Sequence, residues 1–66
     1  MAATWTPKKV RTLRRALGEK TVTFGARFGR SGRTVECWEQ GTRNPDVMVR
    51  RELDRIDALD ARRRRT

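Results

Sequence analysis

Apolar residues recur at helical spacing in the first third of the chain. Val10, Leu13 and Leu17 are three and four positions apart, so a helix would present them on a single face. Thr6 is a favourable N-cap in front of a proline, and Gly18 suits the left-handed conformation in which many helices end. The pattern therefore predicts a first helix between Thr6 and Gly18.

A second apolar stripe predicts a helix near the end of the chain. Its members follow one another at intervals of four, three and three, and they are Val49, Leu53, Ile56 and Leu59. We expect all of them to cover the small core. Either Asn44 or Asp46 is placed to cap this helix, with Pro45 in its first turn.

Charged residues surround this second stripe. Asp54, Asp57 and Asp60 lie about one helical turn from arginines, a spacing that favours exposed ion pairs. Residues 62–66 are almost entirely arginine, and we expect a frayed, solvated basic tail there. The sequence therefore predicts one domain over residues 1–61, followed by that tail.

The segment from residue 21 to residue 40 allows two interpretations. Thr21–Phe24 is rich in β-branched residues and Thr34–Trp38 alternates, so a basic β-hairpin around the intervening glycines is one of them. The other is a pair of short helices around a tight turn, with Phe24 and Phe28 on one apolar stripe. Local residue propensities do not decide between the hairpin and the pair of helices.

The spacing of special residues favours the two helices. Gly25 offers the small residue that a close helix crossing needs, and Gly29 tolerates the positive φ of a tight turn. Ser31 can cap the second helix, and Val35 and Trp38 then fall on its buried face. A hairpin gives no reason for these residues to occur together in this register, which indicates a helix-turn-helix.

These residues also resemble a known family. The residues that carry the resemblance are Leu13-Arg14, Leu17-Gly18, Phe24, Gly25, Phe28-Gly29, Ser31, Val35, Trp38-Glu39, Gly41, Arg43 and Pro45. The family that they resemble is the Cro/CI-type (XRE) helix-turn-helix family. The resemblance implies a compact all-α, lambda-repressor-like domain of four or five helices, with the motif at about residues 21–40. The recognition helix, at about residues 32–40, would enter the DNA major groove. The resemblance further implies a partly buried ion pair between Arg14 and Glu39.

Three positions depart from the family pattern. Thr21 stands where the family usually has an amide that contacts phosphate. Arg30 replaces a residue that is usually apolar and half buried, which favours an arginine reaching outward to phosphate or a different local packing. Gly32 opens the recognition helix where a long polar side chain often reads a base.

Composition restricts the class of partner. Seventeen Lys and Arg residues face eight Asp and Glu residues, which gives a formal net charge of +9 and a pI near 11.6. An excess of this size favours a polyanionic partner such as nucleic acid. The chain has no histidine and only Cys37, so we expect no metal, no cofactor and no enzymatic activity. We also expect a cytoplasmic protein that binds neither a membrane nor a small-molecule ligand.

The few aromatic residues are expected to be structural. Trp38 is expected in the core rather than on a surface where nucleic-acid bases would stack. Of the four aromatic residues, Trp5 is the one not expected to be buried, and its expected role is to pack against Val10 as a hydrophobic staple.

The candidate site residues fall into three groups. Candidates for reading base edges lie along the second motif helix, and they are Gly32, Arg33, Glu36, Cys37 and Gln40. Candidates for contacting phosphate flank the two motif helices, and they are Lys20, Thr21, Arg30, Ser31, Thr34, Arg43 and Asn44. Residues expected to be structural are Arg14, Gly25, Gly29, Val35, Trp38 and Glu39.

The sequence thus predicts a sequence-specific, double-stranded DNA-binding transcriptional regulator. We expect a homodimer that acts as a repressor on a short inverted-repeat operator, because two-fold pairing would place recognition helices one DNA turn apart. One alternative is an antitoxin-like or adaptor module whose main partner is another protein. A further alternative, an RNA or ribosome binder, depends on the β-hairpin interpretation of residues 21–40.

Overall fold

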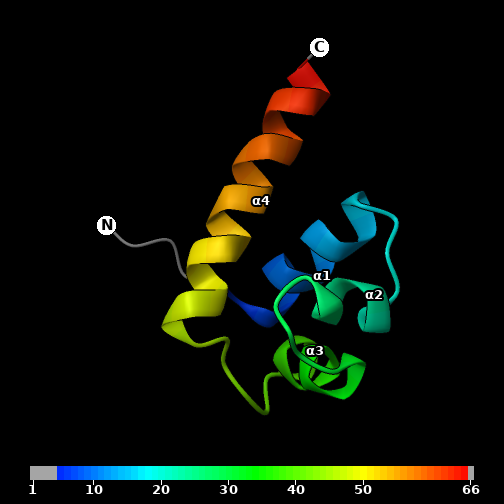
Figure 1. Ribbon diagram of the computed structural model, residues 1–66, viewed down its shortest axis with the longest axis vertical. Helices are drawn as coiled ribbons and strands as arrows, with labels where there is room; N and C mark the ends of the chain where they lie inside the picture. Colours follow the sequence, from blue (N-terminus) through cyan, green and yellow to red (C-terminus); the bar gives the residue numbers. More distant parts are fainter. Residues whose placement is uncertain (1–4, 66) are drawn as a thin grey trace.

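The computed structural model describes residues 5–65, and their side chains as far as Arg63. In this part of the chain there are four helices and no strand: α1 (Pro7–Ala16), α2 (Thr21–Ala26), α3 (Gly32–Gln40) and α4 (Val47–Arg65) (Figure 1). The expectation of an all-α fold is confirmed. The β-hairpin interpretation of residues 21–40 is wrong, and the basis for an RNA or ribosome binder is lost with it.

The ends of α1 follow from local sequence, as predicted. The Thr6 side chain accepts a hydrogen bond from the Lys9 backbone N–H at 3.1 Å, which satisfies one of the donors left free at a helix N-terminus. Gly18 follows the last turn with φ +69°, a conformation that other residues rarely adopt.

At the start of α4, one of the two predicted caps is confirmed and the predicted place of Pro45 is wrong. Asp46 is the cap, because its Oδ1 accepts a hydrogen bond from the Val49 backbone N–H at 2.9 Å. A capping residue must immediately precede the first helical residue, so Pro45 lies before the helix rather than in its first turn. Pro45 is buried in the connection between α3 and α4.

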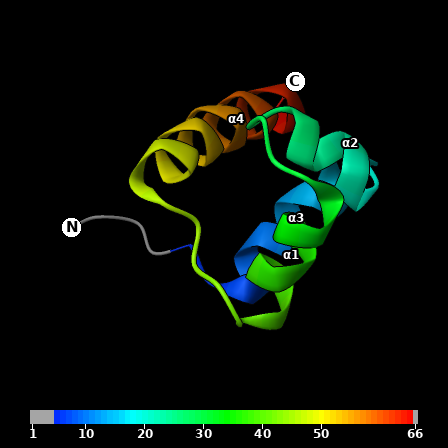
Figure 2. The same ribbon diagram turned by 60° about the horizontal axis from the view of Figure 1, so that its bottom comes forward.

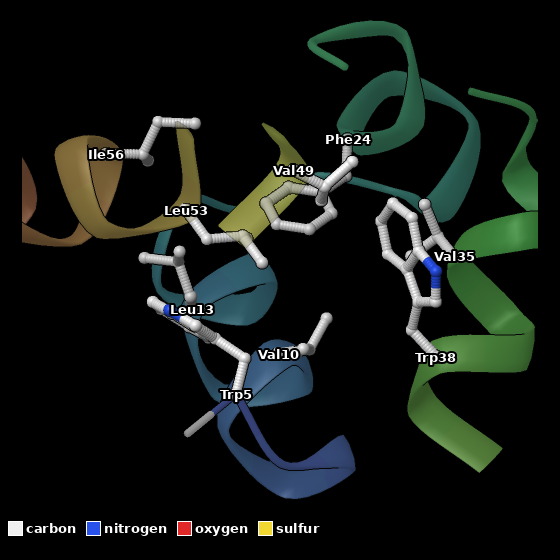
Figure 3. Close-up of a cluster of buried hydrophobic side chains, with 9 residues drawn as sticks. All are labelled: Trp5, Val10, Leu13, Phe24, Val35, Trp38, Val49, Leu53 and Ile56. Atoms are coloured by element: carbon white, nitrogen blue, oxygen red, sulfur yellow. The ribbon is translucent and has the colours of Figure 1, made fainter. Parts of the chain in front are cut away.

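The core draws on all four helices and on the segment before α1. Figure 3 shows its side chains converging from these elements, and they are Trp5, Val10, Leu13, Phe24, Val35, Trp38, Val49, Leu53 and Ile56. Leu17 and Phe28 pack against its margin. Phe28 meets Phe24 and Trp38 edge to face, with ring centroids 5.1 Å and 5.8 Å apart respectively. This arrangement is favourable for aromatic pairs.

Trp5 does more than the predicted staple. Its side chain is only 4% exposed, so the expectation that it is the one unburied aromatic residue is wrong. Its indole Nε1 donates a hydrogen bond to Oδ1 of Asp54 at 2.7 Å, and Lys9 Nζ lies 4.5 Å from the ring centroid. Trp5 therefore ties the beginning of the chain to α4.

The second half of α4 departs from the predicted stripe. Val49, Leu53 and Ile56 are buried, but Leu59 is 47% exposed and Asp60 is buried. The cause is the helical period, which places residue 60 rather than residue 59 one turn beyond Ile56 on the buried face. The expectation that Asp60 belongs to an exposed ion pair is therefore wrong, and Asp54 bonds Trp5 instead.

Helix α4 also includes most of the predicted tail. It continues to Arg65, so the boundary predicted after residue 61 falls inside a helix and the expectation of a frayed tail is wrong. Arginine is a good helix former, and positive charge near a helix C-terminus interacts favourably with the helix dipole. The basic residues at this end of the chain therefore extend from the body on a regular helix (Figure 1).

Helix α3 packs most closely against α2 and α1, and glycines permit the approach to α2. A Cβ atom on Gly25 would lie 2.7 Å from the Arg30 carbonyl oxygen and 2.8 Å from that of Ser31. Both neighbours are backbone atoms, so they cannot move aside as a flexible side chain would. The segment leading into α3 thus passes directly over Gly25.

We expect Gly25→Ala to destabilise the fold by about 1–3 kcal/mol, as overpacking in a close-packed interior typically does. For a domain of this size the melting temperature should fall by roughly 4–8 °C for each kcal/mol, measured by far-UV circular dichroism. Thr23→Ala, at an exposed position of the same helix, is the control and should not lower it. A Gly25→Ala protein that melts with the wild type would contradict the close approach.

Candidate nucleic-acid interface

Residues 27–31 connect α2 to α3 in a tight turn. The backbone N–H groups of Phe28 and Arg30 both donate to the Gly25 carbonyl oxygen at 2.9 Å, and Gly29 adopts φ +68°. Ser31 then caps α3 by accepting a hydrogen bond from the Thr34 backbone N–H at 3.2 Å. These contacts set the course of the chain from α2 into α3. Helix α3 lies at the end of the molecule opposite the C-terminal end of α4 (Figure 1) and beside α1 (Figure 2).

One face of α3 is buried and the opposite face is open. Val35, Trp38 and Glu39 point into the body. The open face carries side chains at helical spacing, and they are Arg33, Glu36, Cys37 and Gln40, of which only Cys37 is partly buried. The structure therefore brings together four of the five residues predicted to read bases.

Gly32, the fifth, is not among them. It is buried against α2, where a Cβ atom would lie 2.9 Å from Cγ2 and 3.0 Å from the backbone nitrogen of Val22. Its small size therefore serves the packing of α3 on α2. Val22, whose own side chain remains 70% exposed, limits what residue 32 can be.

The candidate phosphate contacts surround α3. Five of them are exposed, namely Lys20, Arg30, Ser31, Arg43 and Asn44, and two are partly buried, namely Thr21 and Thr34. The Ser31 hydroxyl also lies 3.1 Å from the Thr34 hydroxyl, so both belong to the cap of α3. Thr21 donates a hydrogen bond to Glu36 Oε2 at 3.4 Å, which links the first residue of α2 to the open face of α3.

Arg30 already has a charged partner. Its Nη2 lies 2.6 Å from Oδ2 of Asp46, the residue whose other oxygen caps α4. Sequence reasoning gave Asp46 as one of two candidate caps but missed this pairing, because the two residues are distant in the sequence and no local pattern connects them. Both side chains are substantially exposed, so the pair is open to exchange with a competing anion.

A hollow of about 240 Å³ adjoins this pair between α3 and the connection to α4. Its lining residues are Arg30, Thr34, Trp38, Arg43, Asn44 and Asp46. Two guanidinium groups, a hydroxyl, an amide and the Asp46 carboxylate are thus gathered beside the open face of α3. Arginine side chains arranged in this way suit phosphate oxygens.

A bidentate ion pair holds α3 to α1. Arg14 Nε lies 2.6 Å from Glu39 Oε2, and Arg14 Nη2 lies 3.0 Å from Oε1. Arg14 Nη1 donates to the Glu19 carbonyl oxygen at 2.9 Å, and Arg11 Nε lies 3.5 Å from Glu39 Oε1. The hydrogen bonds to Glu39 raise the pKa of Arg14 above its usual value, so the guanidinium stays charged.

Comparison with protein-family models, with curated proteins and with solved structures found no match. Among residues 5–65, no cluster of histidine, cysteine or carboxylate side chains is arranged to hold a metal ion. No helix in the same part of the chain is long and apolar enough to cross a membrane. The candidate interface consists of the open face of α3 and the basic side chains around it.

We expect Glu39→Gln to destabilise the fold by about 1.5–3 kcal/mol, the typical contribution of hydrogen bonds to charged groups. Glutamine keeps one acceptor but leaves the Arg14 charge without its counter-ion in a site that is mostly shielded from water. Thermal melting provides the measurement. Glu36→Gln makes the same change of charge on the open face of α3 and should alter stability by less than about 0.5 kcal/mol. Equal melting temperatures for the two variants would refute a structural role for Glu39.

Proposed function

We propose that the protein is a sequence-specific, double-stranded DNA-binding transcriptional regulator, in which α2 and α3 act as a helix-turn-helix of the Cro/CI type. The observation that carries this proposal is the open face of α3, where four polar or small side chains lie on the side opposite the core. A formal net charge of +9 supports a polyanionic partner. The DNA major groove, about 12 Å wide, accommodates an α-helix.

Each side chain on the open face has a base edge that suits it. Arg33, near the start of α3, can donate two hydrogen bonds to O6 and N7 of guanine. Glu36 can accept from N4 of cytosine, and its bond to Thr21 holds the carboxylate toward the start of α2. Cys37 is small enough to pack on a thymine methyl group, and Gln40 offers an amide at the end of the helix.

Basic residues around α3 would position it through the DNA backbone. Lys20 and Arg43 flank the open face, and Arg30 can exchange Asp46 for a phosphate. Contacts of this kind carry affinity and orientation rather than sequence information. In the proposed function the protein acts in the cytoplasm as a homodimeric repressor on a short inverted repeat, with no small-molecule ligand.

A second candidate function, an antitoxin-like or adaptor module with a protein as its main partner, is favoured by one observation. An open groove with apolar side chains lies between α1 and the second half of α4, away from α3. The two functions are compatible within one molecule because they use different surfaces.

Selection of bound duplexes from a randomised pool, at near-physiological salt, tests the proposed function. We expect an inverted repeat with half-sites one helical turn apart to be enriched. Enrichment of a single half-site would support sequence-specific binding but would contradict the proposed homodimer. A folded protein that enriches no sequence would refute the proposed function.

On the selected duplex, Arg33→Ala should weaken binding by about 1–3 kcal/mol and relax the preference at one base pair. Arg62→Ala removes the same charge from an exposed position of α4, at the end of the molecule away from α3. It should reduce the affinity for all duplexes alike and leave the sequence preference unchanged. A loss of affinity after Arg33→Ala that is uniform across sequences would show that Arg33 contacts phosphate rather than a base.

Asp46→Asn should strengthen DNA binding. Asparagine can still cap α4, but it no longer holds the Arg30 guanidinium by charge. Because an exposed ion pair contributes up to about 1 kcal/mol, we expect affinity to rise up to about fivefold. The dependence of log K on log salt should steepen by up to about 0.9, the value of one additional phosphate contact. Titrations at several salt concentrations measure the affinity and its salt dependence. An equal gain in affinity from Asp57→Asn would show that the change in net charge alone causes the effect.

A further inference from the structure

A groove of about 660 Å³ lies between the end of α1 and the second half of α4. Leu17, Ile56 and Leu59 supply its apolar part, and Leu59 is 47% exposed although it lies beside the core. The remaining lining residues are Arg27, Arg55, Asp60, Arg62 and Arg63. The groove thus combines apolar surface with four guanidinium groups and one carboxylate.

This groove lies apart from the candidate DNA-binding surface. No α3 residue lines it, and α3 and the C-terminal end of α4 occupy opposite ends of the molecule (Figure 1). A molecule seated in the groove would therefore leave α3 accessible. An inference about the groove accordingly stands independently of DNA binding.

The charge around the groove restricts its occupant. Arg27 is bound to Glu19, and Arg55 is bound to Glu52. Further along α4, Arg62 is exposed, and the helix continues with arginine at every position to Arg65. Arginines therefore outnumber carboxylates four to one among the charged residues that line the groove. A second copy of the chain would bring the same arginines to face those of this groove, which disfavours self-association at this site.

We propose that this groove binds an acidic, amphipathic helix of a partner protein. Apolar side chains on one face of that helix would cover Leu59 and Leu17, which lie beside the buried Ile56, and its carboxylates would face the arginines of α4. Helices that bind in grooves commonly use anchor residues at positions i, i+3, i+4 and i+7. A flexible polyanion such as single-stranded nucleic acid would use the arginines but would not require Leu59.

The probe is a fluorescent synthetic peptide with leucine at i, i+3, i+4 and i+7 and glutamate at most other positions, titrated with the full chain by fluorescence anisotropy. Leu59→Glu places a carboxylate in the groove and should weaken peptide binding by about tenfold or more. Met48→Glu is the matched control, because it adds the same charge at an exposed apolar position of α4 outside this groove. It should change the affinity by less than about threefold, equivalent to about 0.6 kcal/mol.

Several results would overturn the proposal. A scrambled peptide of the same composition that binds as tightly would show charge attraction alone, and so would an equal loss from Met48→Glu. If sedimentation shows a dimer that Leu59→Glu dissociates and that the peptide disrupts, the groove belongs to a second copy. Circular dichroism of each variant confirms that it is folded. Duplex selection reports separately on α3, so failure of the peptide experiment with intact DNA binding refutes only the groove proposal.

Discussion

Arg14 and Glu39 meet through two hydrogen bonds in a site where the glutamate is almost fully shielded from water. Arg14 also bonds a carbonyl oxygen in the segment that leads to α2, so one guanidinium connects three parts of the chain. The planar guanidinium holds the Glu39 carboxylate at a defined distance and angle, which restricts how α3 can lie on α1. The orientation of the open face of α3, and with it the whole candidate interface, depends on this ion pair.

Around this ion pair, a chain of 66 residues has room for only a thin core. Trp5 compensates in part, because it adds a large buried ring and a hydrogen bond to α4 from the segment before the first helix. Glycine at positions 25 and 32 lets α2 and its following turn approach α3 at backbone distance. Close packing of backbones and a few large buried side chains thus stabilise this fold, as a larger core stabilises a larger domain.

Positive charge is distributed over two distinct surfaces. Near α3, arginines accompany side chains suited to base edges and a hollow suited to an anion. Near the end of α4, arginines border exposed leucine. Asp46 lowers the positive charge of the first surface, because its carboxylate pairs with Arg30. The same carboxylate caps α4, so one side chain affects both the stability of that helix and the charge beside α3. The two surfaces call for different partners, although both attract negative charge.

The sequence by itself determined the features that depend on neighbours along the chain. The cap of α1, the positive φ of Gly18 and Gly29, and the cap of α3 follow from residues within a few positions of one another. The same local reasoning placed the open face of α3, because helical periodicity is set within one element.

Only the tertiary structure decided which surfaces meet. In the folded chain, Gly32, a candidate for reading bases, packs against α2 instead. Trp5 and Asp60 are buried, and Leu59 is exposed beside a groove. The tertiary structure also pairs Arg30 with Asp46. The physical reason is common to all of these: burial and ion pairing depend on elements that approach from distant parts of the chain, and residue spacing within one helix contains no information about that approach.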